Sequence, residues 1–256
     1  MSIHQAAATG FASQAETYQR GRPDYPVAIE AWLREKLGLR QGRHVLDLGA
    51  GTGKFTKRLV ATGADVVAVE PVAEMRGQFT RSLPDVPVLA GSADAIPLPA
   101  NSLDAVVCAQ SFHWFATRET LAEIHRILRP DGMLGLVWNV RDESVPWVQA
   151  ITDILRPYEG DAPRFANGDW KKPFPAPGFT PLEESRFPHT HQGPAEQVII
   201  ERMLSVSFIA ALAPDQRSTV EAALRRLIAS TTDLAGHGEI LFPYRTSAFA
   251  CRRLAG

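Results

Sequence analysis

Glycines and two acidic residues are spaced as in a nucleotide site between His44 and Pro71, where the sequence reads HVLDLGAGTGKFTKRLVATGADVVAVEP. An apolar run is followed by a glycine-rich turn, a helix-like segment and a second apolar run that ends at Glu70. Glycines in such a turn let the backbone approach a ligand closely. An acid about 20 residues beyond the turn commonly accepts hydrogen bonds from both ribose hydroxyls. Because its charge would repel a 2′-phosphate, the pattern predicts a nucleoside site that disfavours NADP.

Three kinds of nucleotide site could follow from this turn. A P-loop needs Ser or Thr after its Gly-Lys pair, but Phe55 follows Gly53 and Lys54, and Leu48 stands where the first glycine belongs. The dinucleotide fingerprint needs glycine at the position of Lys54. The chain instead has G-x-G-x-G preceded by Asp47, whose carboxylate would oppose a diphosphate and suit a cationic amine. S-adenosylmethionine contains an adenosine and such an amine, so it is the favoured ligand.

Five further residues could take part in a transfer reaction at this site. His113 follows an expected strand and is a candidate general base, with a packing role as the alternative. Trp114 is expected to form a wall of the pocket. Arg141, Tyr244 and Arg245 could reach the pocket mouth, where arginine would bind a carboxylate substrate bidentately; a solvated surface position is the alternative for each.

A metal site is not expected. His189 and His191 share one face of a possible strand, as two ligands might. No cysteine or acid at ligand spacing completes the set, so the sequence predicts no metal.

Strand and helix patterns alternate through the first half of the chain. The expected strands are HVLDLG, VVAVE, VPVLAG, DAVVCAQ and MLGLVWNV, the last reached through a turn at RPDG. Short loops between apolar strands and helices indicate a parallel sheet covered on both faces, which right-handed crossovers make doubly wound. The fold class is therefore α/β.

The second half has a different character. A proline-rich stretch from Pro157 to Pro188 precedes helix candidates at Pro194 and Pro214, and EILFPYR is an expected late strand with LEESRFPHTH as its possible partner. We expect residues 1–256 to form a single domain. Its expected parts are a cofactor-binding core at 40–140, an N-terminal arm at 1–35, a substrate cap at 141–238, and a terminal strand region at 239–256.

Composition excludes several classes of protein. The formal net charge of −1 gives no overall field to hold nucleic acid or an anionic membrane. Two cysteines cannot form a disulfide framework, and the N-terminus lacks the basic and apolar regions of a secretory signal. No uncharged stretch is long enough to span a bilayer. The expected location is cytoplasmic.

Successive motifs resemble one enzyme family. VLDLGAGTG, VVAVEP, GSADAIPLPANSLDAVVCAQSFHWF and LAEIHRILRPDGMLGLVWN are similar to the motifs of class I S-adenosylmethionine-dependent methyltransferases. FASQAETYQRGRPDYP and QSFHWF resemble the type 11 subset that includes trans-aconitate methyltransferase-like proteins. The resemblance covers residues 11–140 well. It implies a Rossmann-like methyltransferase fold with a seven-stranded sheet, mostly parallel, whose last strand is antiparallel.

The resemblance also implies roles for individual residues in binding S-adenosylmethionine. The methionine-side loop would be Asp47, Gly49, Gly51, Thr52 and Gly53. Glu70 would bind the ribose, Pro71 and Val72 would flank the adenine, and Ser92 and Ala93 would read its edge, although relatives often have Asp where Ser92 stands. Gln110 would line the methionine end, and Tyr18 and Arg22 would close over the cofactor.

The leading hypothesis is a methyltransferase that acts on a small molecule, through a carboxylate or hydroxyl acceptor, by in-line methyl transfer. An NAD-dependent oxidoreductase is the first alternative. The chain lacks the third glycine that such an enzyme would need. None of its tyrosines is followed by lysine in the Tyr-x-x-x-Lys spacing that the short-chain class uses. A cofactor-binding partner protein without turnover is the second. The oligomeric state is not predicted.

Overall fold

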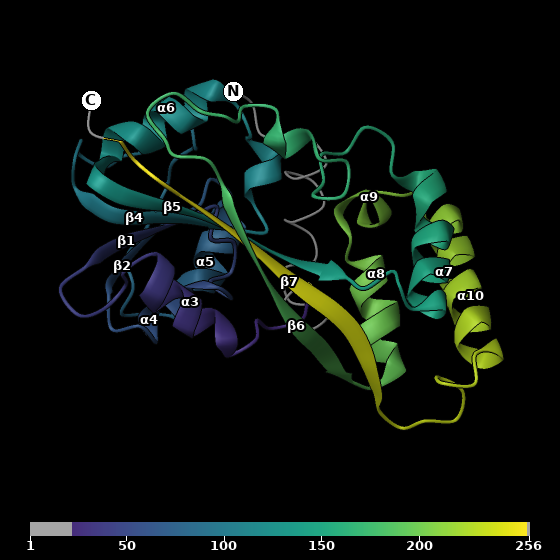
Figure 1. Cartoon of the computed structure of the whole chain (residues 1–256). Helices are drawn as coiled ribbons and strands as arrows, with labels where there is room; N and C mark the ends of the chain where they lie inside the picture. Colours follow the sequence, from purple (N-terminus) through teal and green to yellow (C-terminus); the bar gives the residue numbers. More distant parts are fainter. Residues whose placement is uncertain (1–21, 255–256) are drawn as a thin grey trace.

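A seven-stranded sheet forms the centre of the part of the chain that the computed structural model describes, residues 22–254 (Figure 1). Its strand order is β3-β2-β1-β4-β5-β7-β6, and β7 alone runs opposite to the other six strands. The strands are β1 (His44–Leu48), β2 (Asp65–Val69), β3 (Val88–Leu89), β4 (Leu103–Ala109), β5 (Leu128–Arg141), β6 (Glu183–Gly193) and β7 (Ile240–Arg252). The predicted α/β fold with an antiparallel last strand is confirmed.

Helices cover both faces of the sheet because alternate strand residues enter two different cores. Val45 packs with α3 (Ala28–Lys36) and α4 (Thr56–Val60), whereas Leu46 packs with α6 (Arg118–Ile127) on the opposite face. Helix α5 (Ala73–Ser82) follows β2, and the short turn η1 (Phe112–Trp114) follows β4. Successive side chains of a strand point to opposite faces, so the apolar runs of the sequence read as strands buried on both sides.

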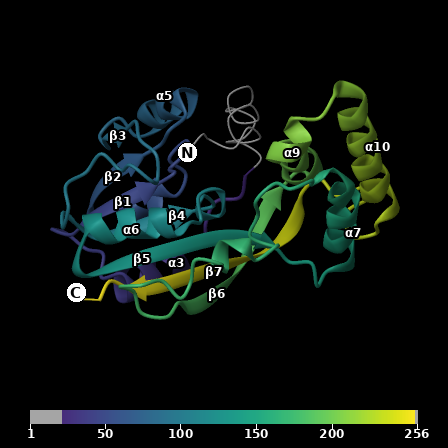
Figure 2. The ribbon, with the colours of Figure 1, turned by 90° about the horizontal axis from the view of Figure 1, so that it is seen from above.

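A helical cap lies beside the sheet, at the right of Figure 2. Its elements are α7 (Pro146–Leu155), η2 (Arg156–Tyr158), the π-helical turn η4 (Glu196–Glu201), α8 (Arg202–Leu204), α9 (Ser207–Ala210) and α10 (Pro214–Ser230). The turn η3 (Asp169–Lys171) packs against the sheet instead, because its Trp170 contacts Trp138 and Phe249. The first half of β7 belongs to the cap, since Ile240 and Phe242 lie in the apolar core of the cap. The second half, with Phe249, lies in the core of the sheet. One continuous strand therefore fixes the cap relative to the sheet.

Two features of the sheet differ from the sequence expectations. The expected turn at RPDG lies inside β5, which begins at Leu128; Leu128 pairs with Leu103, and the register then jumps so that Ala105 pairs with Met133. Asp131 takes a positive φ of 60° in this bulge. Strand β6 lies within residues 141–238, the range expected to form the cap, and pairs with β7 over its whole length.

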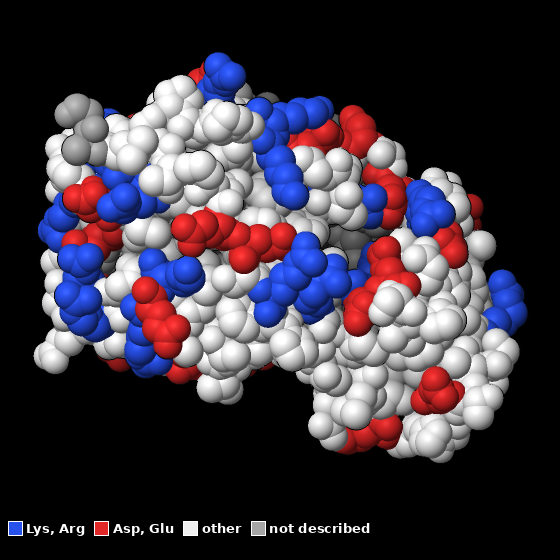
Figure 3. All heavy atoms as spheres, viewed as in Figure 1, with Lys and Arg blue, Asp and Glu red and all other residues white. Residues whose placement is uncertain are grey.

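The surface carries both signs of charge. Figure 3 shows Lys and Arg side chains interspersed with Asp and Glu over the face viewed there. Within residues 22–254, no helix is long and apolar enough to cross a membrane.

Candidate active site

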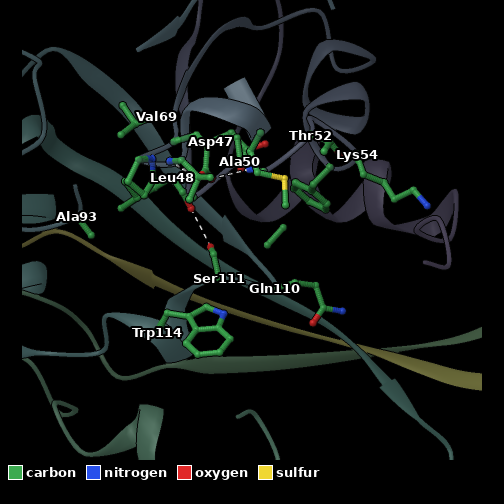
Figure 4. Close-up of a pocket in the computed structure, with 18 of the residues that line it drawn as sticks. Asp47, Leu48, Ala50, Thr52, Lys54, Val69, Ala93, Gln110, Ser111 and Trp114 are labelled. Carbon is green, nitrogen blue, oxygen red and sulfur yellow. Dashed lines mark hydrogen bonds between the residues drawn. The ribbon is translucent and has the colours of Figure 1, made fainter. Parts of the chain in front are cut away.

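A cavity of about 210 Å³ opens beyond the carboxyl ends of β1, β2 and β4. This is the edge at which open α/β sheets bind ligands. Most residues that the sequence assigns to the cofactor line it: Arg22, Asp47, Gly49, Gly51, Thr52, Glu70, Pro71, Val72, Ser92, Ala93 and Gln110, together with Trp114 from the expected pocket wall. In Figure 4 the glycine-loop residues lie on one side of the cavity and Gln110 and Trp114 on the other. Tyr18 lies outside the described residues.

The glycine loop is held between the ends of three strands. Gly49 has a φ of +72°, and a Cβ there would lie 2.8 Å from the Cβ of Ser111. Ser111 Oγ donates to the Leu48 carbonyl at 2.8 Å, and Gly49 N donates to the Val69 carbonyl at 2.8 Å (Figure 4 draws the first). Gly51 has a φ of +57°, and a Cβ there would meet no heavy atom within 4 Å. The loop therefore needs glycine at both positions, and Gly51 leaves open space beside the cavity.

Glu70 presents a fixed carboxylate at the end of β2. Its side chain is buried, with one oxygen accepting from Gly51 N and the other from Val72 N, each at 2.9 Å. Burial raises the pKa of Glu70, opposed by these two backbone hydrogen bonds and by Arg76. Each carboxylate oxygen has lone-pair capacity beyond one hydrogen bond. The arrangement can therefore accept two further hydrogen bonds, as a ribose diol would donate them.

Asp47 supplies a second carboxylate, and only one of its two oxygens accepts a hydrogen bond from the described residues. The residue is 1% exposed, and its Oδ2 accepts from Thr56 Oγ1 at 2.6 Å. Its Oδ1 is buried with no hydrogen-bond partner among residues 22–254. Burial, helped by the nearby charge of Glu70, raises the pKa of Asp47 to about 7 against the hydrogen bond from Thr56. An ammonium group in the cavity would satisfy this oxygen, so the residues present fit the amino-acid end of S-adenosylmethionine.

Gly53 is the loop residue that does not line the cavity. Its φ is +84°, and a Cβ there would lie 2.8 Å from Leu83 Cδ1 and 2.9 Å from Phe79 Cδ2, both from the region of α5. The glycine that the sequence assigns to the cofactor loop thus packs the loop against a helix.

Replacing Gly53 by alanine should lower the free energy of unfolding by roughly 2–4 kcal/mol, because strain and overlap add. Gly42 has a similar φ of +77° with nothing within 4 Å of a Cβ, so Gly42→Ala should cost only about 1 kcal/mol. Urea unfolding of both variants measures the difference. Equal losses would show that the Phe79 contact is irrelevant.

His113 is placed differently from the predicted general base. It does not line the cavity, and its Nδ1 accepts a hydrogen bond from Trp138 Nε1 at 3.1 Å. The neutral ring then carries its proton on Nε2 and has no nitrogen left to accept another. Burial lowers the pKa of His113 to about 3, and Arg22 and Arg164 act in the same direction. The geometry favours the packing role over the base.

The predicted substrate residues of β5 and β7 do not reach the cavity either. Arg141 points its Nη1 at the sulfur of Met203, 3.3 Å away, and burial lowers the pKa of its guanidinium. Tyr244 is buried, and its hydroxyl has no hydrogen-bond partner within the described chain. Arg245 is exposed. Only Trp114 of the expected substrate residues lines the cavity.

Two basic residues of the cavity were not assigned a role from the sequence. Lys54 follows the glycine loop, and its Nζ donates to the Arg22 carbonyl. Burial lowers the pKa of Lys54 to about 8. Arg202 comes from α8 in the cap. A charge between the apolar residues Ile200 and Met203 is the sequence signal that could have revealed it. No group of three His, Cys, Asp or Glu side chains that could hold a metal occurs within residues 22–254.

Several proteins that are similar in sequence to this chain are named as methyltransferases. The family model for a methyltransferase domain matches residues 46–136. An uncharacterized methyltransferase-like protein of Schizosaccharomyces pombe is 38% identical over 244 residues, which cover 95% of each chain.

Solved structures agree on the fold. One assigned to a type II methyltransferase of Anaeromyxobacter dehalogenans is 25% identical, with a TM-score of 0.60 over 91% of this chain and 97% of that one. A Haemonchus contortus phosphoethanolamine N-methyltransferase, solved with S-adenosylhomocysteine, is 13% identical with a TM-score of 0.58 over 100% of this chain and 61% of that one; this likeness concerns the fold alone. The narrower trans-aconitate subset stays a prediction. The motifs, the sheet and the full-length relatives together place this chain in the class I S-adenosylmethionine-dependent methyltransferase family.

Proposed function

We propose that this protein binds S-adenosylmethionine in the described cavity and transfers its methyl group to a small molecule. The observation that carries the proposal is the pair of buried carboxylates, Asp47 and Glu70, at the ends of neighbouring strands. Asp47 has an unsatisfied oxygen for an ammonium, and Glu70 has acceptor capacity for a diol. One ligand would use both.

The cavity residues that the sequence assigns to the cofactor have separate roles in this proposal. Bound S-adenosylmethionine would supply a methyl group activated by its sulfonium, and the pair of electrons of the broken bond would return to sulfur on in-line transfer to an acceptor. Asp47 and the glycine loop hold the amino-acid end, and Glu70 holds the ribose. Pro71, Val72, Ser92 and Ala93 surround the adenine. Gln110 and Trp114 face the loop and exclude water from the reacting atoms, a positioning effect that can reach roughly 7–11 kcal/mol. Arg22, from the N-terminal arm, closes over the cofactor.

The acceptor in this proposal is a small molecule that does not need deprotonation by His113. Because that imidazole is engaged by Trp138 and has a low pKa, an acceptor that is already ionised suits the site best. The formal net charge of −1 and the mixed charges of Figure 3 favour a small molecule over a nucleic acid. We further propose that core, arm and cap act as one catalytic domain.

The test separates this function from the two alternatives. S-adenosylhomocysteine should raise the melting temperature of the protein, by several degrees at 100 times its Kd, and NAD should not, because Asp47 would face the NAD diphosphate. Stabilisation by NAD alone would contradict the proposal. Transfer of label from methyl-tritiated S-adenosylmethionine to a panel of small acids and phenols should follow; binding without any transfer would favour a partner protein.

A further inference from the structure

Arg202 is a buried cation that no acidic side chain of the described residues neutralises. It begins α8, directly after the π-helical turn η4, lines the cavity and is 8% exposed. Its Nε and Nη1 are buried without a hydrogen-bond partner, and it forms no ion pair within the described residues. A guanidinium stays charged at any ordinary pH, and burying it uncompensated is costly. Such a group persists where a ligand completes its interactions.

The surroundings of Arg202 are basic on the side of the cap. Burial lowers the pKa of Lys54 on the cofactor loop and of Arg141 at the end of β5. The positive charge of Arg202 lowers both pKa values further. Burial and then the charges of Lys54 and Arg202 lower the pKa of His191 on β6 to about 4, so this imidazole is neutral at pH 7. Arg164, also nearby, is already paired with Glu159. Asp24, which is paired with Arg58, and Glu143, which accepts from Thr152, act in the opposite direction on Lys54 and Arg141, but neither forms an ion pair with Arg202 within the described residues.

We propose that the methyl acceptor is a small organic acid and that Arg202 binds its carboxylate. This inference rests on the proposed function and names its substrate class. The unpartnered nitrogens of Arg202 would donate charge-assisted hydrogen bonds to the carboxylate oxygens. Arg202 belongs to α8 of the cap, whereas the carboxylates Asp47 and Glu70, which are assigned to the cofactor, lie at the ends of β1 and β2. It is therefore a specificity-determining residue for the acceptor.

A carboxylate monoanion matches this site better than a phosphate dianion. The cavity already contains Asp47 and Glu70, which would repel the second negative charge. Among the described cationic residues of the cavity, only Arg202 has two buried nitrogens without a hydrogen-bond partner. Arg22 and Lys54 take part in other interactions. The carboxylate at the amino-acid end of the cofactor could also bind Arg202. The experiment therefore distinguishes this carboxylate from that of the acceptor.

The experiment measures ligand binding to the protein saturated with S-adenosylhomocysteine. The probes are benzoate, hexanoate and phenylacetate, each with its amide, and phenyl phosphate, titrated by NMR. In the unchanged protein at least one carboxylate should bind 10- to 100-fold more tightly than its amide. Arg202→Gln should abolish that preference, and Arg202→Lys should restore part of it. Arg226→Gln removes an exposed arginine of the same cap and should change nothing.

Two outcomes would overturn the inference. The first is that no carboxylate is preferred over its amide, or that phenyl phosphate binds best. The second is that Arg202→Gln weakens S-adenosylhomocysteine but leaves 5′-methylthioadenosine, which lacks the amino-acid end, unaffected; the guanidinium would then hold the cofactor. Should Arg202→Gln fail to fold, Arg202→Lys carries the same comparisons. Failure of the proposed function would appear separately, as no S-adenosylhomocysteine binding by the unchanged protein.

Discussion

Replacing Glu70 by glutamine should weaken the binding of S-adenosylhomocysteine at least 100-fold. The carboxylate of Glu70 already accepts from Gly51 N and Val72 N, and the proposed ribose contacts add one hydrogen bond to each oxygen. A charge-assisted hydrogen bond contributes roughly 1.5–3 kcal/mol, and glutamine offers only one oxygen for four donors. Its amide group would also face a backbone N–H, which repels it. One ribose contact is lost, the other loses its charge assistance, and the amide repulsion adds to both, so the sum exceeds the roughly 2.7 kcal/mol that a 100-fold change represents.

Titration calorimetry with S-adenosylhomocysteine checks this prediction. Glu74→Gln makes the same chemical change at an exposed position of α5 and should leave the affinity unchanged. Circular dichroism shows whether the Glu70 variant keeps its fold, since one of the two backbone donors loses its acceptor. A folded Glu70→Gln protein that binds within threefold of the unchanged protein would remove the ribose role and with it the placement of the nucleoside.

The sheet could be predicted where its signals are local. Strands β1, β2 and β4 are apolar runs ended by a glycine or a polar residue, and their pairing in a doubly wound sheet follows from general rules. The extents of β6 and β7 could not be read in the same way. Their ribbon gains its length from pairing with each other and from packing in the cap, which are contacts between segments far apart in the sequence.

The residues of the site were likewise predictable only where a local sequence pattern marks them. The glycine loop and Glu70 are recognisable because backbone conformation and spacing leave a local pattern. Gly53 carries the same pattern, yet it faces Phe79 instead of the cavity, because a motif does not say which way each glycine turns. Arg141 and Arg202 were distinguishable only in three dimensions: the direction of α8 and the position of Met203 decide which guanidinium lines the cavity.

Asp47 should make the protein less stable as pH rises, in contrast to an ordinary aspartate. Its folded pKa of about 7 lies above the ordinary value of 3.8, so between these values the folded state binds more protons than the unfolded state. Stability from this group is therefore lost as pH rises from about 4 to 7, and the loss is complete above 7. Asp47→Asn removes the cost and should gain on the order of 4 kcal/mol at pH 8, with no gain at pH 4. Urea unfolding at the two pH values measures both.

The same substitution should weaken the cofactor while it stabilises the protein. Asparagine has no charge for the ammonium of S-adenosylhomocysteine, so its affinity at pH 8 should fall roughly 10- to 100-fold. The affinity for 5′-methylthioadenosine, which has no ammonium, should stay the same. In the unchanged protein the affinity for S-adenosylhomocysteine should rise between pH 6 and 8 as Asp47 ionises, and in Asp47→Asn that rise should vanish. A variant that is more stable at pH 8 yet binds both ligands as tightly as before would show that the unpartnered oxygen of Asp47 serves no ligand.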